Sequence, residues 1–197
     1  MDKQMSLSAL SDELARVVAL LTERNLILKK GTIVDSTFIE APSSTKNKDK
    51  KRDPEAHSAK KGNTWHFGYK AHVEVDHETG LVHALEVTSA NKHDVCMMAK
   101  LLTVEEQVVY GDSGYLGAEK RPEAITTNKA GKRICYKINR RPSRSKHNSN
   151  RSRAQIKRRE REKSSVRAKV EHVFAVVKQQ MHFRKTRYRG LQKQTAN

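Results

Sequence analysis

The chain has 197 residues, of which 36% are hydrophobic and 31% are charged, and its formal net charge is +18. This length suits one domain with its own core and some attached arms. The sequence contains no long apolar run of the kind that spans a membrane, and its first residues lack the blocks of a secretory signal. Because Cys96 and Cys135 form no CxxC pair, we expect a reducing compartment, the cytoplasm, and no structural zinc.

The positive charge is concentrated in the second half of the chain. Residues 129–193 hold 23 Lys and Arg against 3 acidic residues, a net charge of +20, whereas the remainder holds 17 against 19. Such an asymmetry indicates a polyanionic partner, and nucleic acid is the usual one. An anionic membrane is the weaker alternative, because the basic half lacks an amphipathic face rich in Trp and Leu.

The first elements are a helix and a strand. Residues 6–24 repeat Leu and Val at helical spacing, which predicts an amphipathic helix that packs on the core. The stretch GTIVDSTFIE, from Gly31, is rich in β-branched residues and predicts a strand of about seven residues. Asp35 lies in the middle of this strand, where a carboxylate is costly to desolvate. We expect another group to offset that cost.

A polar segment and a hairpin follow. Residues 41–64 are rich in lysine and without periodicity, which predicts a basic loop in which His57 is solvated rather than a ligand. Residues 65–75 and 81–88 are predicted strands, and the turn between them ends at Gly80. The two strands are therefore expected to pair.

The next segment alternates a helix with two short strands. Asp94 suits the N-cap of a helix with the sequence VCMMAKLL. A fourth strand over residues 107–112 ends in Asp112, and residues 132–138 are a candidate for a fifth strand.

Residues 164–178 form a predicted helix with a valine-rich face. Arg167, Glu171 and Lys178 lie within about 40° of each other, on a stripe beside that face. In the simplest interpretation, Arg167 and Glu171 are a surface ion pair one turn apart, worth a few tenths of a kcal/mol. In the alternative, Glu171 is the outlying ligand of a metal site assembled from elsewhere in the chain.

Residues 139–163 are almost entirely charged or polar. The first half is a predicted linker, and the second half is either a solvated helix or an extension of the helix that carries Glu171. The basic residues here and in the tail are expected to contact phosphates. They are Arg151, Arg153, Lys157, Arg158 and Arg159, followed by Arg184, Arg187 and Arg189.

The order of the elements suggests a site built from three carboxylates. Asp35 lies in the first strand, Asp112 ends the fourth, and Glu171 is on the last helix. Ligand sites of such sheets lie at the carboxyl ends of strands, so Asp35 and Asp112 meet there if the first and fourth strands are neighbours. Three carboxylates can hold two Mg²⁺ ions for phosphoryl transfer. The pattern favours a metal-dependent phosphoryl transferase acting on nucleic acid.

Several stretches carry a family resemblance. They are GTIVDST, APSSTKNKDKKRDPE, KKGNTWHFGYKAHVEVD, TSANKHD, YGDSGYLGAEKRPE, RAKVEHVFAVVK and RYRGLQKQTA. From about Leu26 onward the chain resembles bacterial insertion-sequence transposases with an RNase H-like DDE catalytic domain, of the group named after insertion sequence five. The resemblance implies an α/β fold, with an RNase H-like mixed five-stranded sheet flanked by helices and with basic arms.

The resemblance also implies how the chain is divided into segments. Residues 1–28 are an N-terminal helical segment, residues 29–180 are the catalytic domain, and residues 181–197 are a basic tail. Residues 41–64 and 139–163 are a basic loop and a basic linker within the catalytic domain.

In this family, the resemblance implies, Asp35, Asp112 and Glu171 are the catalytic and metal-binding triad. Two Mg²⁺ ions are the implied cofactors, and Mn²⁺ substitutes for them. Arg167 and Lys178 match the signature R-x-x-x-E-x-x-x-x-x-x-K, which implies contacts with DNA ends. The implied activity is DNA strand cleavage and strand transfer in transposition of an insertion sequence. The implied partners are transposon ends, target DNA and a second copy of the chain on DNA, in the bacterial cytoplasm at the nucleoid and away from membranes.

The chain departs from the family pattern in two respects. The related signature places a Tyr three residues before the Arg, where this chain has Ser164, so the role of that Tyr is not carried over. Only 34 residues precede Asp35, and the chain stops at Asn197. We therefore expect a transposase truncated at both ends, without sequence-specific end binding. The alternatives are an inactive DNA-binding protein derived from a transposase and a basic structural protein of ribosomal type.

Overall fold

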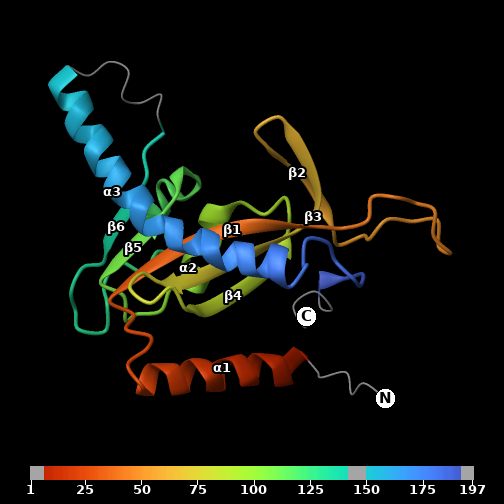
Figure 1. The fold of residues 1–197 in the computed structure, drawn as a ribbon, viewed down its shortest axis with the longest axis horizontal. Helices are drawn as coiled ribbons and strands as arrows, with labels where there is room; N and C mark the ends of the chain where they lie inside the picture. Colours follow the sequence, from red (N-terminus) through yellow and green to blue (C-terminus); the bar gives the residue numbers. More distant parts are fainter. Residues whose placement is uncertain (1–6, 142–149, 192–197) are drawn as a thin grey trace.

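The computed structural model describes residues 7–141 and 150–191, and in these ranges the side chains of residues 7–12, 150 and 151 are left out. The centre of the molecule is a six-stranded mixed sheet in the order β2-β3-β1-β5-β6, with β4 paired to β3 (Figure 1). Its strands are β1 (Gly31–Glu40), β2 (His57–Lys61), β3 (Thr64–Asp76), β4 (Val82–Ser89), β5 (Val108–Gly111) and β6 (Cys135–Ile138).

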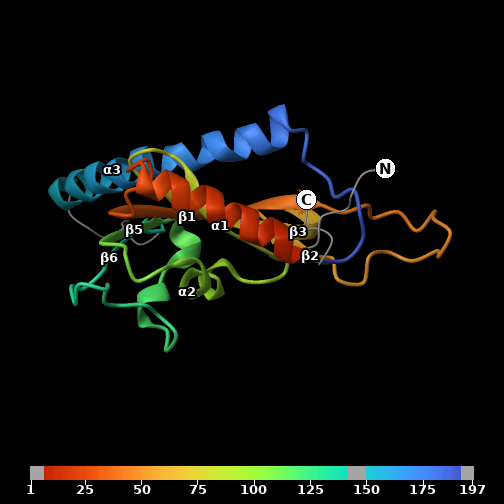
Figure 2. The ribbon, with the colours of Figure 1, turned by 90° about the horizontal axis from the view of Figure 1, so that it is seen from below.

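Helices lie on both sides of this sheet. The long helix α3 (Asn150–Ala175), which continues as a π-helical turn (Val176–Gln180), crosses one face, and the short helix α2 (Met98–Leu101) lies on the other (Figure 2). The predicted α/β class, a mixed sheet flanked by helices, is confirmed. No helix in the described ranges is long and apolar enough to cross a membrane.

The pairing of β1 determines where the functional side chains lie. β1 pairs antiparallel with β3 along nearly its whole length and parallel with β5 only from Gly31 to Val34, which lies opposite Gly111. The expectation that the first strand and the strand ending at Asp112 are neighbours is confirmed. Because β5 ends at Gly111, the second half of β1 continues past it without a β5 partner.

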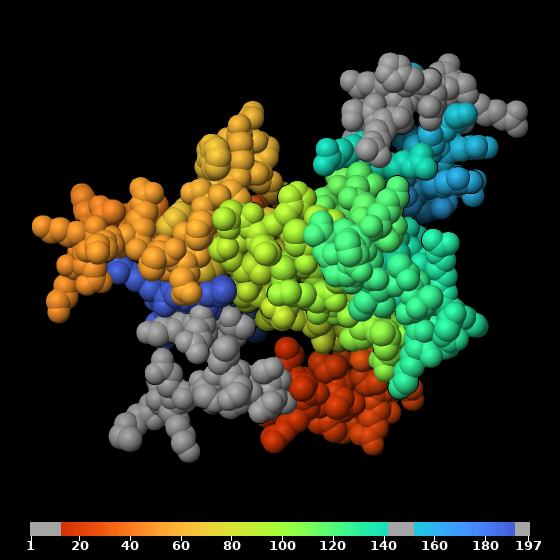
Figure 3. Space-filling view, turned by 180° about the vertical axis from the view of Figure 1, so that it is seen from behind, coloured from red at the N-terminus to blue at the C-terminus, as the bar shows by residue number. Residues whose placement is uncertain are grey.

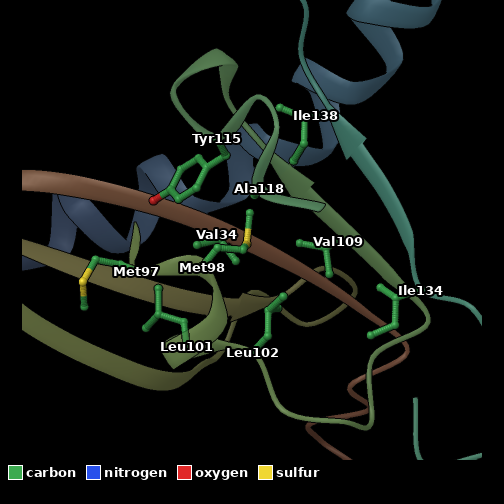
Figure 4. Close-up of a cluster of buried hydrophobic side chains, with 10 residues drawn as sticks. All are labelled: Val34, Met97, Met98, Leu101, Leu102, Val109, Tyr115, Ala118, Ile134 and Ile138. Atoms are coloured by element: carbon green, nitrogen blue, oxygen red, sulfur yellow. The ribbon is translucent and has the colours of Figure 1, made fainter. Parts of the chain in front are cut away.

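Two apolar clusters hold the layers together. Val170 of α3 is fully buried against Ile33, Val73 and Val75, so the predicted apolar face of this helix is confirmed. On the opposite face Figure 4 shows Val34 of β1 packed against residues of α2 and of the segment that follows β5. Successive residues of a strand point to opposite faces, which is why Ile33 and Val34 serve different clusters.

The sheet has six strands rather than the predicted five. The additional strand is β2, which lies inside the segment expected to be a basic loop. Lys61 pairs with Thr64 across a two-residue turn in which Gly62 has a φ of 60°. A positive φ at the first turn residue matches the twist of a hairpin and favours glycine. The extra strand is therefore stabilised by this turn and by pairing with β3, neither of which hydrophobic periodicity reveals.

The prediction that Asp94 caps a helix is wrong. Asp94–Cys96 is a single 3-10 turn preceded by His93, which makes no side-chain cap, and α2 has only four residues. The carboxylate of Asp94 instead accepts a hydrogen bond of 2.9 Å from Lys70 of β3. Asp94 therefore binds the ammonium of Lys70 rather than the amides of a helix N-terminus.

The second half of the basic segment 139–163 follows one of the two alternatives left open by the sequence. The helix that carries Glu171 begins at Asn150, so the second half of the predicted linker is its N-terminal extension.

The first helix, α1 (Leu7–Glu23), is confirmed, but its expected packing is wrong, because Leu14, Val17 and Leu20 are exposed. Figure 3 shows α1, in red, at the border of the molecule. Its helical periodicity reflects amphipathicity, which does not specify a partner.

Candidate active site at the end of β5

Two carboxylates lie side by side where β5 ends. Asp112 directly follows Gly111, and Asp35 directly follows Val34, which is the register partner of Gly111 in the parallel pair. Adjacent positions on neighbouring parallel strands lie about 5 Å apart. The negative charge of Asp112 contributes to raising the pKa of Asp35, which reflects this proximity.

Asp35 is held by two donors in a largely buried environment. Its Oδ1 accepts a hydrogen bond of 2.7 Å from the backbone N–H of Ser36, and its Oδ2 accepts one of 2.9 Å from Nη2 of Arg167. The other terminal nitrogen of Arg167 donates to Asn139 at 3.2 Å. Burial raises the pKa of Asp35, and Arg167 opposes this shift without reversing it. Arg167 is the group that offsets the cost of a carboxylate inside a strand.

Asp112 is fixed by the turn that follows β5. Its Oδ1 accepts a hydrogen bond of 2.7 Å from the N–H of Gly114, so it caps the 3-10 turn Ser113–Tyr115. A Cβ at Gly114 would lie 2.9 Å from that oxygen, which is closer than side chains approach. The glycine therefore lets the turn close around the carboxylate and hold it at the end of the strand.

Glu171 lies one helical turn beyond Arg167, on the exposed side of α3. The simple interpretation, an ion pair of Arg167 with Glu171, is not what the structure has, because Arg167 pairs with Asp35. Glu171 instead lines a cavity of about 660 Å³ together with Thr37 and Phe38 of β1. It therefore faces the part of β1 that continues past the end of β5.

The donor set fits a divalent cation. Asp35 and Asp112 offer carboxylate oxygens, which are the ligands that Mg²⁺ prefers, and the guanidinium of Arg167 already supplies a positive charge to Asp35. Within residues 7–141 and 150–191, no three His, Cys, Asp or Glu side chains form a group close enough to share one ion. The structure thus brings two of the three predicted carboxylates together and leaves Glu171 beside them, and the triad stays a prediction.

Cations gather in the cavity that Glu171 lines. Lys178 and Arg184 were predicted to contact DNA, and both line it, together with Lys61 of β2 and Lys185. Burial lowers the pKa of Lys178, and the positive charges of Lys61 and Arg184 lower it further, while the negative charge of Glu40, which also lines the cavity, opposes this shift. Such crowding of like charges is relieved by an anion. We call this cavity, lined by the positively charged side chains of Lys61, Lys178, Arg184 and Lys185, the cation cavity.

The other predicted basic residues lie away from this cavity. Four of them are exposed on the N-terminal half of α3, namely Arg153, Lys157, Arg158 and Arg159, while the side chain of Arg151 lies outside the described residues. In the tail, Arg187 is exposed, and Arg189 is bound to Asp49 at 2.9 Å. Arg189 thus ties the tail to the segment between β1 and β2.

Sequence reasoning missed several polar residues near the pair. Lys61 and Lys185 went unnoticed because they lie in segments with many lysines and no pattern. Lys70 and Tyr115 are both buried. The available signal was the two-residue period of β3, which places Lys70 on the inner face of a strand.

The chain from residue 27 to residue 197 matches the family model described as transposase DDE domain. No solved structure matches the chain. The match covers all of the sheet, α3 and both carboxylates at the end of β5.

Proposed function

The chain belongs to the transposase DDE domain family, and from this premise we propose that it cleaves DNA strands and transfers them during transposition. The observation that carries the proposal is the pair of carboxylates, Asp35 and Asp112, at the end of β5. A cation cavity adjoins this pair along the same strand. The net charge of +18 supports DNA as the substrate.

Asp35 and Asp112 are the residues that hold a divalent cation, and Glu171 on α3 is the third ligand. When bound there, Mg²⁺ or Mn²⁺ would polarise the scissile phosphate and activate the attacking oxygen. Arg167 holds Asp35 in place before a cation binds, through its bond to Oδ2. Its other terminal nitrogen donates to Asn139, so the guanidinium stays at the site and can donate to a phosphate oxygen in place of the carboxylate.

The DNA strand follows the second half of β1, which continues past the end of β5. From Asp35 the strand leads to Thr37 and Phe38, which line the cavity, and α3 runs from Arg167 past Glu171 to Lys178 beside it. The cation cavity then neutralises the phosphates next to the scissile one. The exposed arginines in the first half of α3 neutralise more distant phosphates.

A non-catalytic DNA-binding protein is the second candidate. One observation favours it: Asp35 is engaged by Arg167, and Glu171 is exposed, so the three carboxylates are not gathered. Binding through the basic surfaces needs none of these carboxylates. Membership of the group named after insertion sequence five, bacterial origin and a homodimer on DNA stay predictions.

The test is metal binding, followed by strand cleavage. We expect millimolar Mn²⁺ to raise the thermal midpoint of the wild-type chain, because a ligand of the folded state stabilises it, and Asp112→Asn to abolish the rise. We expect Asp35→Asn to abolish Mn²⁺-dependent nicking while DNA retention on a filter is unchanged. A midpoint that Mn²⁺ leaves unchanged in the wild type, with normal DNA retention, would establish the second candidate instead.

A further inference from the structure

A buried polar layer lies behind the two carboxylates. Lys70 of β3 is almost fully buried, and its Nζ donates to Oδ1 of Asp94 and to the backbone carbonyl of Lys92, both at 2.9 Å. A lysine is rarely buried unless it is paired. Asp94 supplies that pairing, so the layer is formed by a neutralised ion pair rather than by apolar packing.

Asp94 is a close neighbour of Asp112. A Cβ built on Gly114 would lie 2.9 Å from Oδ1 of Asp112 and 3.6 Å from Oδ2 of Asp94. The two carboxylates therefore approach the same glycine. Since Lys70 neutralises Asp94, a further negative charge is tolerated next to the pair that we assign to the cation.

Tyr115 completes the layer. Its ring is fully buried in the apolar cluster, and Figure 4 shows its hydroxyl reaching toward β1. Burial raises the pKa of Tyr115 well above its usual value, and the charges of Asp94, Asp35 and Asp112 raise it further. Nevertheless, this hydroxyl makes no well-formed hydrogen bond among the described residues, and the polar group beside it is the side chain of Ser36, the residue after Asp35, which lowers the pKa of Tyr115. A buried hydroxyl without a partner is unfavourable, which calls for an explanation.

We propose that Tyr115 is a positioning residue whose hydroxyl donates a hydrogen bond to the Asp35–Asp112 pair when a divalent cation binds, with the Lys70–Asp94 ion pair supporting it from behind. The inference rests on the proposed function, because it assigns the cation to those carboxylates. A cation held by Asp35 would compete with Arg167 for Oδ2, which would free this carboxylate to change its hydrogen-bond partners. A donor that is unpaired beforehand then gains its partner only in the bound state, and the bond contributes wholly to cation affinity.

The distinctive consequence is a pair of effects with opposite signs. Tyr115→Phe removes a hydroxyl that has no partner, so the thermal midpoint without metal stays the same or rises. The same change removes a group that orients a metal ligand, and the dissociation constant for Mn²⁺ rises about tenfold or more. A residue with a merely structural role would not combine an unchanged or raised midpoint with a weaker affinity for Mn²⁺.

The chain offers a matched control in Tyr136. Its hydroxyl donates a hydrogen bond of 2.6 Å to the carbonyl of Ile125, and Tyr136 packs against the same apolar cluster as Tyr115. Tyr136→Phe therefore lowers the thermal midpoint and leaves Mn²⁺ affinity as in the wild type. Affinity is measured as free Mn²⁺ by electron paramagnetic resonance during a titration of the full chain.

The outcomes separate this inference from the proposed function. Wild-type affinity in Tyr115→Phe, or a lowered midpoint without metal, overturns the role of Tyr115. If Asp112→Asn abolishes Mn²⁺ binding in that case, the proposed site stands and only the inference fails. If Asp112→Asn binds Mn²⁺ as the wild type does, the proposed site itself is wrong.

Discussion

Arg167 on α3 donates a hydrogen bond of 2.9 Å to Asp35 in the middle of β1, across 132 residues of sequence. This ion pair joins the long helix to the strand that carries the site. It also places a guanidinium where two neighbouring carboxylates would otherwise repel each other. The stability of the fold and the charge of the site therefore depend on the same contact.

We expect Arg167→Gln to lower the free energy of unfolding by roughly 1–3 kcal/mol at pH 7, because it leaves Asp35 largely buried without its cation. Arg167→Lys keeps the charge but cannot bond to both Asp35 and Asn139, so it costs less. Urea unfolding of the two variants measures the difference. Equal stability of the wild type and Arg167→Gln would contradict this account.

The pH dependence of stability should reveal the raised pKa of Asp35. Burial is the main cause of the shift above about 3.8, so the folded state holds this proton more tightly than the unfolded state. The contribution to stability is present below the unfolded pKa and is lost as pH rises through the folded pKa. Asp35→Asn should therefore be more stable than the wild type at pH 7, and the two thermal midpoints should converge in acid. A difference that stays constant with pH would show that the carboxylate charge is not the cause.

The cation cavity predicts an asymmetry along β2. Both lysines are exposed, but Lys61 lines the cavity, whereas Lys60 lies on the opposite face of the strand. We expect Lys61→Gln to weaken binding of a short DNA oligonucleotide and to reduce the salt slope by about one, the loss of one phosphate contact. Lys60→Gln serves as the charge-matched control. Equal losses in both variants would indicate general electrostatic attraction without a cavity.

The first half of α3 should act on DNA without regard to sequence. Replacing Lys157, Arg158 and Arg159 by Gln removes three exposed positive charges from one segment of this helix. We expect weaker binding to all DNA sequences and a flatter salt dependence, because phosphate contacts carry no sequence information. Binding measured against unrelated duplexes tests this. A loss confined to one sequence would point to base readout by α3.

Val170 links the core to the site. It is fully buried between α3 and the sheet, and Arg167 and Glu171 lie on the same helix one turn and one residue away. Val170→Ala should lower the free energy of unfolding by roughly 2 kcal/mol, from lost burial and a residual cavity. Val176→Ala, at an exposed position of the π-helical turn that continues α3, is the control and should cost little. Similar losses in both would mean that this helix face does not anchor α3.

The sequence by itself determined the elements that rest on local pattern. Helical spacing of valines specified the buried face of α3, and β-branched alternation specified β1 and its Asp35. The turn ending at Gly80 predicted the pairing of β3 with β4. The concentration of positive charge in the second half of the chain followed from counting the charged residues of the sequence. These features are readable because periodicity and turn chemistry act over a few residues.

Only the tertiary structure decided which side chains meet. Arg167 pairs with Asp35 rather than with Glu171, and Asp94 pairs with Lys70 rather than capping a helix. The strand β2 forms because its backbone pairs with β3. The first two contacts join segments separated by other elements, and the third depends on an unpaired edge of β3. Local patterns leave such contacts open, because the energy of a charge or an unpaired strand edge depends on what the fold places beside it.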